Sequence, residues 1–191
     1  MTKGRLEAFS DGVVAIIITI MVLELKVPHG GDLAVLRPLL PTFLTYAMSF
    51  VFVGIYWNNH HHLLHATTKI DGGVLWANNH LLFWLSLTPF TTGWMGENHF
   101  APLPVAVYGI DLLLSAIAYY ILVRAILRAE GPHSKLGAAI GDDFKGKVSG
   151  VLYAVAIPLA FVERWAALAI YVLVACVWLV PDRRMVATNR A

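Results

Sequence analysis

The sequence predicts an all-α integral membrane protein with six transmembrane helices and both termini in the cytoplasm. Of its 191 residues, 58% are hydrophobic and only 14% are charged, whereas soluble domains average about 45–50% apolar and about 25% charged residues. A chain of this composition cannot hide its apolar surface in one water-soluble core, so most of it must lie in a bilayer. Two further observations support the prediction. The apolar residues fall into six runs, and lysine and arginine are unevenly distributed between the segments that join them.

Six apolar runs, bounded by proline, glycine or charged residues, give the predicted transmembrane helices. A helix needs roughly 20 mostly apolar residues to cross the hydrocarbon core. The predicted spans are residues 6–25, 39–58, 73–93, 105–127, 148–162 and, after a tight turn at 163–164, 165–180. Glycine, asparagine and two prolines predict a loop over 95–104, and the polar residues 128–147 predict an intracellular linker. We expect one six-helix repeat over residues 1–182 and a short basic cytoplasmic tail over 183–191.

The positions of lysine and arginine orient these helices. With the N-terminus inside, the outer segments carry three of the 14 basic residues, Lys26, Arg37 and Arg164, and the inner segments carry the rest. Inner loops are the ones enriched in lysine and arginine, so both termini are expected in the cytoplasm. A secretory signal peptide also begins with basic residues. However, the first apolar run is too long and ends in Glu24-Leu25-Lys26 rather than at a small-residue cleavage site, which predicts a retained helix.

The first predicted helix has a carboxylate inside its apolar run. Asp11 lies about a turn and a half from the start, and a charge costs about 2.5–3.5 kcal/mol at the bilayer centre and less near an interface. We therefore expect Asp11 to have polar partners. At 100° per residue, one stripe of this helix contains Gly12, Ile16, Thr19, Ile20 and Leu23, and Ser10 and Asp11 point away from it. Spacing alone does not assign a function to this stripe, because the same pattern is typical of an ordinary helix-packing face.

A short motif at the start of this helix resembles that of a known family. Arg5, Phe9, Ser10 and Asp11 spell R-x-x-x-F-S-D, and glycine, valine and a run of isoleucines with a threonine follow. This is similar to the transmembrane protein 175 family, the lysosomal-type potassium channels and their prokaryotic relatives. The strings G-I-Y-W-N-N-H-H, N-N-H and L-S-L-T-P-F in the second and third spans also resemble the family pattern. The resemblance is dense over the first half of the chain and only topological over the last two spans.

The resemblance implies a potassium-selective leak channel in the cell membrane, with the prokaryotic plasma membrane as the expected location. Family members lack the carbonyl-lined T-V-G-Y-G filter, and layers of bulky aliphatic side chains from the first helices form the constriction instead. Carried over to this chain, the layers are Ile16, Ile20 and Leu23, with Thr19 as a nearby hydroxyl that helps to distinguish ions. Such a ring blocks water and ions when closed and admits a partly dehydrated ion when open. Potassium is then the permeant ion, without any cofactor or enzymatic activity.

One copy of a helix cannot surround a pore, so the resemblance also implies a homotetramer with four first helices around the axis. It further implies a hydrogen-bond network on the polar back of the first helix. In this network Trp57, His61 and His80, with Asn58 or Asn79, hold Ser10 and Asp11 together with the motif residues Arg5 and Phe9. The sequence does not distinguish between the adjacent histidines at 60–62.

Two other classes of function remain open at this point. A proton pathway or secondary transporter would use the intramembrane groups Asp11, Asp111 and His80. A metal-dependent membrane enzyme would use the histidine tract, since His61 and His65 are one helical turn apart, but di-metal membrane enzymes use several separate histidine clusters. For Asp111 we favour a hydrogen bond to a neighbouring helix over a proton relay. The formal net charge of +2 is too small to indicate nucleic-acid binding.

Overall fold

The computed structural model describes residues 2–131, 134, 136–137 and 143–179, and this part of the chain is helical without any strand. The predicted tail over 183–191 and much of the predicted linker lie outside the described residues. Two short 3₁₀ helices, η1 (Val22–Glu24) and η2 (Leu33–Leu39), flank the first loop. The six long helices are α1 (Lys3–Met21), α2 (Leu40–His65), α3 (Gly72–Glu97), α4 (Pro102–Glu130), α6 (Phe144–Leu159) and α7 (Arg164–Leu179).

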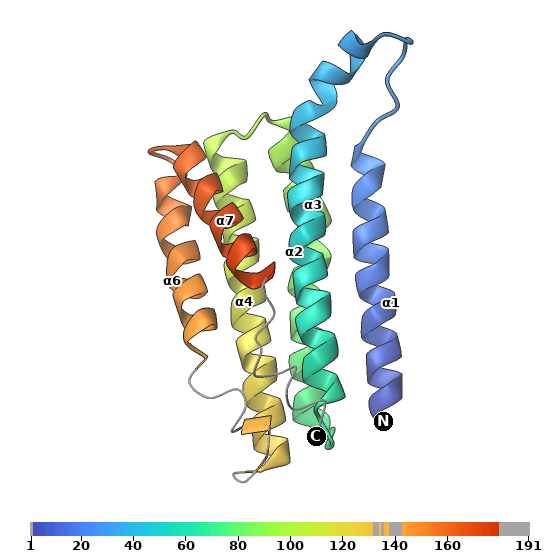
Figure 1. The fold of residues 1–191 in the computed structure, drawn as a ribbon, viewed down its shortest axis with the longest axis vertical. Coiled ribbons are helices and arrows are strands. Elements are labelled where there is room, and N and C mark those ends of the chain that lie inside the picture. The colour runs from blue at the N-terminus through green and yellow to red at the C-terminus, as the bar shows by residue number, and fades with distance from the viewer. Residues whose placement is uncertain (1, 132–133, 135, 138–142, 180–191) are drawn as a thin grey trace.

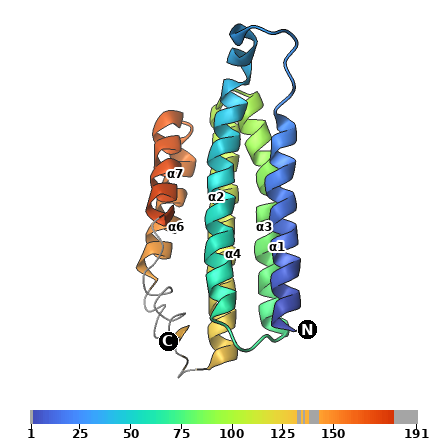
Figure 2. The same cartoon turned by 45° about the vertical axis from the view of Figure 1, so that its right-hand side comes forward.

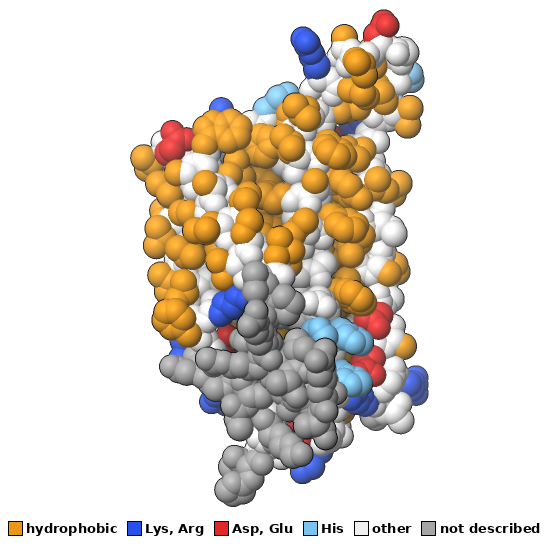
Figure 3. All heavy atoms as spheres, in the orientation of Figure 1, with side chains coloured by type: hydrophobic (Ala, Val, Ile, Leu, Met, Phe, Trp, Pro, Cys, Tyr) orange, Lys and Arg blue, Asp and Glu red, His pale blue; other side chains and the backbone are white. Residues whose placement is uncertain are grey.

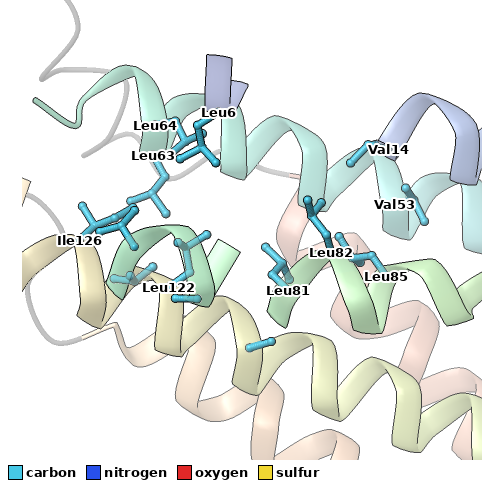
Figure 4. Packing of buried hydrophobic residues seen from close by; sticks show 14 of the residues in the cluster. Leu6, Val14, Val53, Leu63, Leu64, Leu81, Leu82, Leu85, Leu122 and Ile126 are labelled. Carbon is cyan, nitrogen blue, oxygen red and sulfur yellow. The ribbon is translucent and has the colours of Figure 1, made fainter. Parts of the chain in front are cut away.

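The long helices run roughly side by side as a bundle (Figures 1 and 2). α1 lies at one edge and packs against α2 and α3, whereas α6 and α7 form a hairpin at the other edge and pack against α4 and α2. Buried apolar side chains join α1 to its neighbours, with Leu6 close to Leu63 and Leu64 and with Val14 close to Val53 (Figure 4). α1 therefore has one packed side and one side that faces away from the chain.

Each predicted span corresponds to one of these helices, and the largest difference is at the end of α2. The predicted span stops at residue 58, but α2 continues to His65. Leu63 and Leu64 are fully buried in this extension, so packing stabilises the last two turns although they carry four histidines. The histidine tract is consequently part of the helix and not of the loop that follows.

Three segments are long and apolar enough to cross a membrane by length and composition, namely 3–24, 33–65 and 102–130. α3 has 26 residues but contains Asn78, Asn79 and His80 in its first half. α6 and α7 have 16 residues each, or about 24 Å at 1.5 Å per residue, and hydrocarbon is about 30 Å thick. Exposed apolar side chains still cover the middle of the bundle, while charged ones gather toward its two ends (Figure 3).

Basic residues are concentrated at the end of the bundle that holds the N-terminus. The start of α1, the loop between α2 and α3, and the end of α4 meet there (Figure 1). They contribute Lys3, Arg5, Lys69, Arg124 and Arg128, whereas the opposite end has Lys26, Arg37 and Arg164. The folded chain thus keeps the asymmetry on which the predicted orientation rests.

A close approach between α4 and α7 occurs at Gly109. A Cβ atom at this position would overlap the hydroxyl of Tyr171 and lie 2.7 Å from its Cζ atom. Gly109→Ala is expected to lower the free energy of unfolding by about 1–3 kcal/mol because the side chains must shift. Thermal unfolding of the detergent-purified protein measures this loss. Gly54→Ala is the matched control, since no atom lies within 4 Å of its added Cβ, and equal melting temperatures for the two variants would contradict the expectation.

Candidate functional site

α1 has two faces that differ in burial. The packed face contains Leu6, Ser10, Val14, Ile17 and Met21, all of them buried. The opposite face contains Gly12, Ile16, Thr19 and Ile20 of the stripe recognised in the sequence, whereas Leu23 lies in η1, just after α1 ends at Met21. The large side chains are exposed by 59% at Ile16, 45% at Ile20 and 74% at Leu23. Among the described residues of one chain, then, none covers these large side chains of the apolar stripe. The side chain of Ile17, one residue from Ile16, is only 4% exposed, because it points into the bundle.

Thr19 is the polar member of the exposed stripe. Its hydroxyl lies 2.9 Å from the carbonyl oxygen of Ala15 and 3.1 Å from that of Ile16, and it donates back to its own helix. A hydroxyl that donates its single hydrogen in this way keeps an oxygen with free acceptor capacity. The stripe therefore places one oxygen acceptor between aliphatic side chains, and such an acceptor suits a cation better than an anion.

The packed face of α1 carries a buried polar chain that joins three helices. The Asn78 amide nitrogen donates to Ser10 Oγ at 3.0 Å, and its carbonyl oxygen lies 2.7 Å from His60 Nε2. The Ser10 hydroxyl in turn donates to the carbonyl oxygen of Leu6. Ser10 and Asn78 are fully buried and His60 is 4% exposed. Each of these polar groups has a hydrogen-bond partner. This row of buried side chains therefore fixes α1 against α2 and α3 without leaving any of its own polar groups unsatisfied.

Asp11 has a separate partner at the edge of the packed face. The Trp57 indole nitrogen donates to Asp11 Oδ1 at 2.9 Å, as the resemblance implied. His61 takes no part in this hydrogen bond. It stacks on Trp57 with 6.0 Å between ring centroids, and His65 stacks on it in turn. Asp11 and Trp57 are both exposed in the single chain, so this pair lies at the surface and not in the buried network of Ser10.

The network differs from the prediction at two positions. The histidine that takes part is His60 rather than His61, since His60 faces the bundle at the same level as Ser10. On α3 the partner is Asn78. His80 instead accepts a hydrogen bond from Trp84 Nε1 of its own helix at 2.9 Å. Two residues turn a helix by about 200°, so Asn78 and His80 cannot both face α1.

The remaining two motif residues lie outside the buried chain. Arg5 is exposed, and the ring of Phe9 is 52% exposed on the same side as the apolar stripe. Neither is brought to the Ser10 cluster. Sequence reasoning missed the roles of His60 and Asn78, although helical phase carried the signal. Asn78 lies on the same face of α3 as Leu81, Leu82 and Leu85. An apolar stripe of this kind predicts a buried face, so it also predicts that Asn78 is buried.

Asp111 lies inside the bundle, away from α1. The hydroxyls of Thr88 and Thr91 on α3 donate to its Oδ2 atom at 3.0 and 3.1 Å. This agrees with the expectation of a hydrogen bond to a neighbouring helix. Asp111 Oδ1 and Ser115 Oγ, one turn further along α4, have no hydrogen-bond partner among the described residues. In the described part of the chain, no group of three or more histidine, cysteine or acidic residues is arranged to hold a metal ion.

The pair of Asp11 and Trp57 leads to a prediction about the stability of the fold. Asp11→Ala is expected to reduce the amount of folded, assembled protein more than it changes any ion preference, because it leaves the Trp57 indole without its acceptor. Size-exclusion yield and ion-flux measurements on the same preparation compare the two effects. Asp11→Asn keeps an acceptor and is the matched control. If Asp11→Asn assembles normally but loses cation preference, Asp11 faces the conduction path instead.

Taken together, the fold and the site define a multi-pass helical membrane protein whose first helix leaves an apolar face uncovered. A family model described as "Endosomal/lysosomal potassium channel TMEM175" matches residues 5–89. A potassium channel of Chryseobacterium sp. is 59% identical over 97% of this chain and 96% of its own length. The chain belongs to the TMEM175 family. Its relatives are ion channels and not enzymes, in agreement with the sequence analysis.

A solved structure and a vertebrate relative extend the comparison. The crystal structure of a lysosomal potassium-selective channel TMEM175 homolog from Chamaesiphon minutus matches with a TM-score of 0.75. The two share 28% identity, and the match covers 94% of this chain and 97% of that one. The chicken protein named endosomal/lysosomal proton channel TMEM175 is 40% identical over 36% of this chain, a match that covers 16% of the chicken protein.

Proposed function

We propose that this chain is the subunit of a homotetrameric, potassium-selective leak channel, and that α1 of four copies forms its hydrophobic constriction. The names of full-length bacterial relatives and of the matching crystal structure support the potassium selectivity. The observation that carries the constriction is the exposure of Ile16 and Ile20 on the side of α1 opposite its packed face, and of Leu23 in η1 directly after it. An apolar stripe of this kind suits either lipid or other copies of the chain. A channel favours the second, because one copy of a helix cannot surround a pore.

The proposed constriction works by excluding water. Four copies of Ile16, Ile20 and Leu23 would form stacked aliphatic rings, and a narrow apolar ring loses its water and stops conducting. When the rings move apart, an ion that has shed part of its hydration shell passes. Potassium gives up water more easily than sodium, so the ring favours potassium. The free acceptor of Thr19, next to Ile20, would stabilise the partly dehydrated cation.

The proposed orientation puts the N-terminus and the basic end of the bundle in the cytoplasm. The support is the excess of arginine and lysine at that end over the end with Lys26, Arg37 and Arg164. The cell membrane of a prokaryote is the proposed location, because the full-length relatives come from bacteria. In this orientation Asp11 lies in the cytoplasmic half of α1 and Leu23 lies beyond its outer end.

The assembly leads to a prediction of its own. The purified protein is expected to have four times the 21.0 kDa mass of one chain, because a narrow axial pore needs several copies of one helix. Native mass spectrometry from detergent measures this directly. A functional monomer would exclude a pore lined by α1 of several subunits.

Ion flux through purified protein in liposomes tests the proposed function. Vesicles loaded with potassium, sodium or a pH-sensitive dye compare the three permeant ions on one preparation. Potassium is expected to leave faster than sodium, and empty vesicles give the background. Flux that matches empty vesicles for all three ions would contradict the proposal.

Proton permeation is a second candidate, favoured by two observations. The vertebrate relative is named a proton channel. In addition, the buried carboxylate oxygen Oδ1 of Asp111 has no hydrogen-bond partner among the described residues. Intramembrane carboxylates of this kind often belong to proton pathways. Asp111→Asn separates the candidates, since it abolishes proton flux that depends on Asp111 and leaves potassium flux through an α1-lined pore intact.

A further inference from the structure

A groove between α3 and α4 opens at the basic end of the bundle. Its volume is about 670 Å³, and its lining includes Trp76, His80, Tyr120, Arg124 and Arg128. Arg124 and Arg128 are one helical turn apart and exposed, and neither forms an ion pair with any described residue. The nearest acidic residue along α4, Glu130, instead accepts hydrogen bonds from the backbone of Thr68 and Lys69. The groove thus has two positive charges that no described carboxylate pairs with.

The rest of the groove is apolar and aromatic. The Trp76 ring is 77% exposed. Tyr120 and Ile121, which come about one helical turn before Arg124 on α4, are 43% and 41% exposed. Tryptophan and tyrosine side chains of this kind favour the boundary between headgroups and hydrocarbon. The charges therefore lie at headgroup depth, and an apolar track leads from them toward the middle of the bundle.

We propose that this groove binds an anionic phospholipid of the inner leaflet. Arg124 and Arg128 contact its phosphate, and one acyl chain lies along Tyr120 and Ile121 past the Trp76 ring. Basic pockets between transmembrane helices on the cytoplasmic side recognise anionic headgroups in this way, and arginine binds phosphate through two parallel N–H donors. The inference requires the proposed orientation but not ion conduction, so it can hold even if the channel proposal fails.

Quenching of tryptophan fluorescence by brominated lipid tests the site. The full-length protein is placed in phosphatidylcholine vesicles with a minor fraction of brominated phosphatidylglycerol, or with the same fraction of brominated phosphatidylcholine. The contribution of Trp76 is the difference between the wild-type protein and Trp76→Phe. We expect phosphatidylglycerol to quench Trp76 more than phosphatidylcholine does. The Arg124→Gln/Arg128→Gln variant is expected to bind it about 10- to 30-fold more weakly, at about 1 kcal/mol per basic residue.

Three controls make the result specific. Arg37→Gln/Arg164→Gln removes the same charge from the opposite end and is expected to keep the extra quenching. Arg124→Lys/Arg128→Lys keeps both charges but loses the paired N–H donors, so it is expected to keep part of the extra quenching. Added inorganic phosphate is expected not to displace the lipid. Equal quenching of Trp76 by the two lipids, an equal loss in the Arg37/Arg164 variant, or displacement by phosphate would each overturn the site. No quenching of Trp76 by either lipid would overturn it too, because another protein surface then covers the groove.

Discussion

Ile16→Asn is expected to raise total cation flux and to bring sodium permeability close to that of potassium. Ile16 is 59% exposed on the uncovered stripe of α1, and four asparagine amides in one ring would hold water where the aliphatic ring excludes it. A barrier lowered by about 1.4 kcal/mol raises the rate tenfold. Leu23→Ala widens another ring and is expected to act in the same direction. Flux of the two cations from proteoliposomes measures both effects.

Neighbouring positions on α1 provide the controls for this effect. Ile17 is 4% exposed and Ile18 is partly buried against the core, so neither shares the stripe. Ile18→Asn and the conservative Ile17→Val are expected to change the yield of folded protein but not the ion preference. Thr19→Val keeps the side-chain volume and removes the oxygen acceptor, which is expected to reduce selectivity with little effect on assembly. If Ile18→Asn changes selectivity and Ile16→Asn does not, the pore face has been assigned to the wrong side of the helix.

Asn78→Leu is expected to lower the free energy of unfolding by about 2–4 kcal/mol, because it removes both hydrogen bonds of a fully buried side chain. The change leaves the ring of His60 without its partner and the hydroxyl of Ser10 without its donor. A stability loss of this size is expected to appear as a sharp decrease in folded, detergent-stable protein. Thermal unfolding followed by size-exclusion chromatography measures it.

The neighbouring Asn79 gives a matched control for this second effect. Asn79 is exposed, so Asn79→Leu makes the same chemical change without burying an unsatisfied group. The double variant Ser10→Ala/Asn78→Ala is expected to cost less than the sum of the two single changes, because the two side chains share one hydrogen bond. Equal stability of Asn78→Leu and Asn79→Leu would show that the buried chain does not hold α1 in place.

The sequence predicted the helices of this fold well because the bilayer forces long apolar runs into helices. Spacing also grouped Ile16, Thr19 and Ile20 on one side of α1. It did not show whether that side is packed or exposed, and the structure packs the opposite side. The network was harder to predict. The sequence offered three adjacent histidines and two adjacent asparagines, and the choice depends on the rotation of α2 and α3 about their axes. In the folded chain these rotations bury Leu63, Leu64 and Leu81 in the core that α1 to α4 share.

The extension of α2 was not predictable for a related reason. Four histidines at the end of an apolar run are typical of a segment at the membrane surface, and hydropathy places the boundary before them. In the folded chain Leu63 and Leu64 contact the core that α1, α3 and α4 share, and this packing carries the helix to His65. Burial by neighbouring helices thus outweighed the local polarity of the tract.

The most direct test of the central claim is the reversal potential of the reconstituted protein in a planar bilayer with potassium on one side and sodium on the other. A potassium-selective pore lined by α1 predicts a potential displaced toward the potassium equilibrium value. It also predicts that Ile16→Asn moves this potential toward zero while Ile18→Asn leaves it unchanged. A wild-type potential at zero, or one that none of the changes at Ile16, Ile20 and Leu23 moves, would contradict the account.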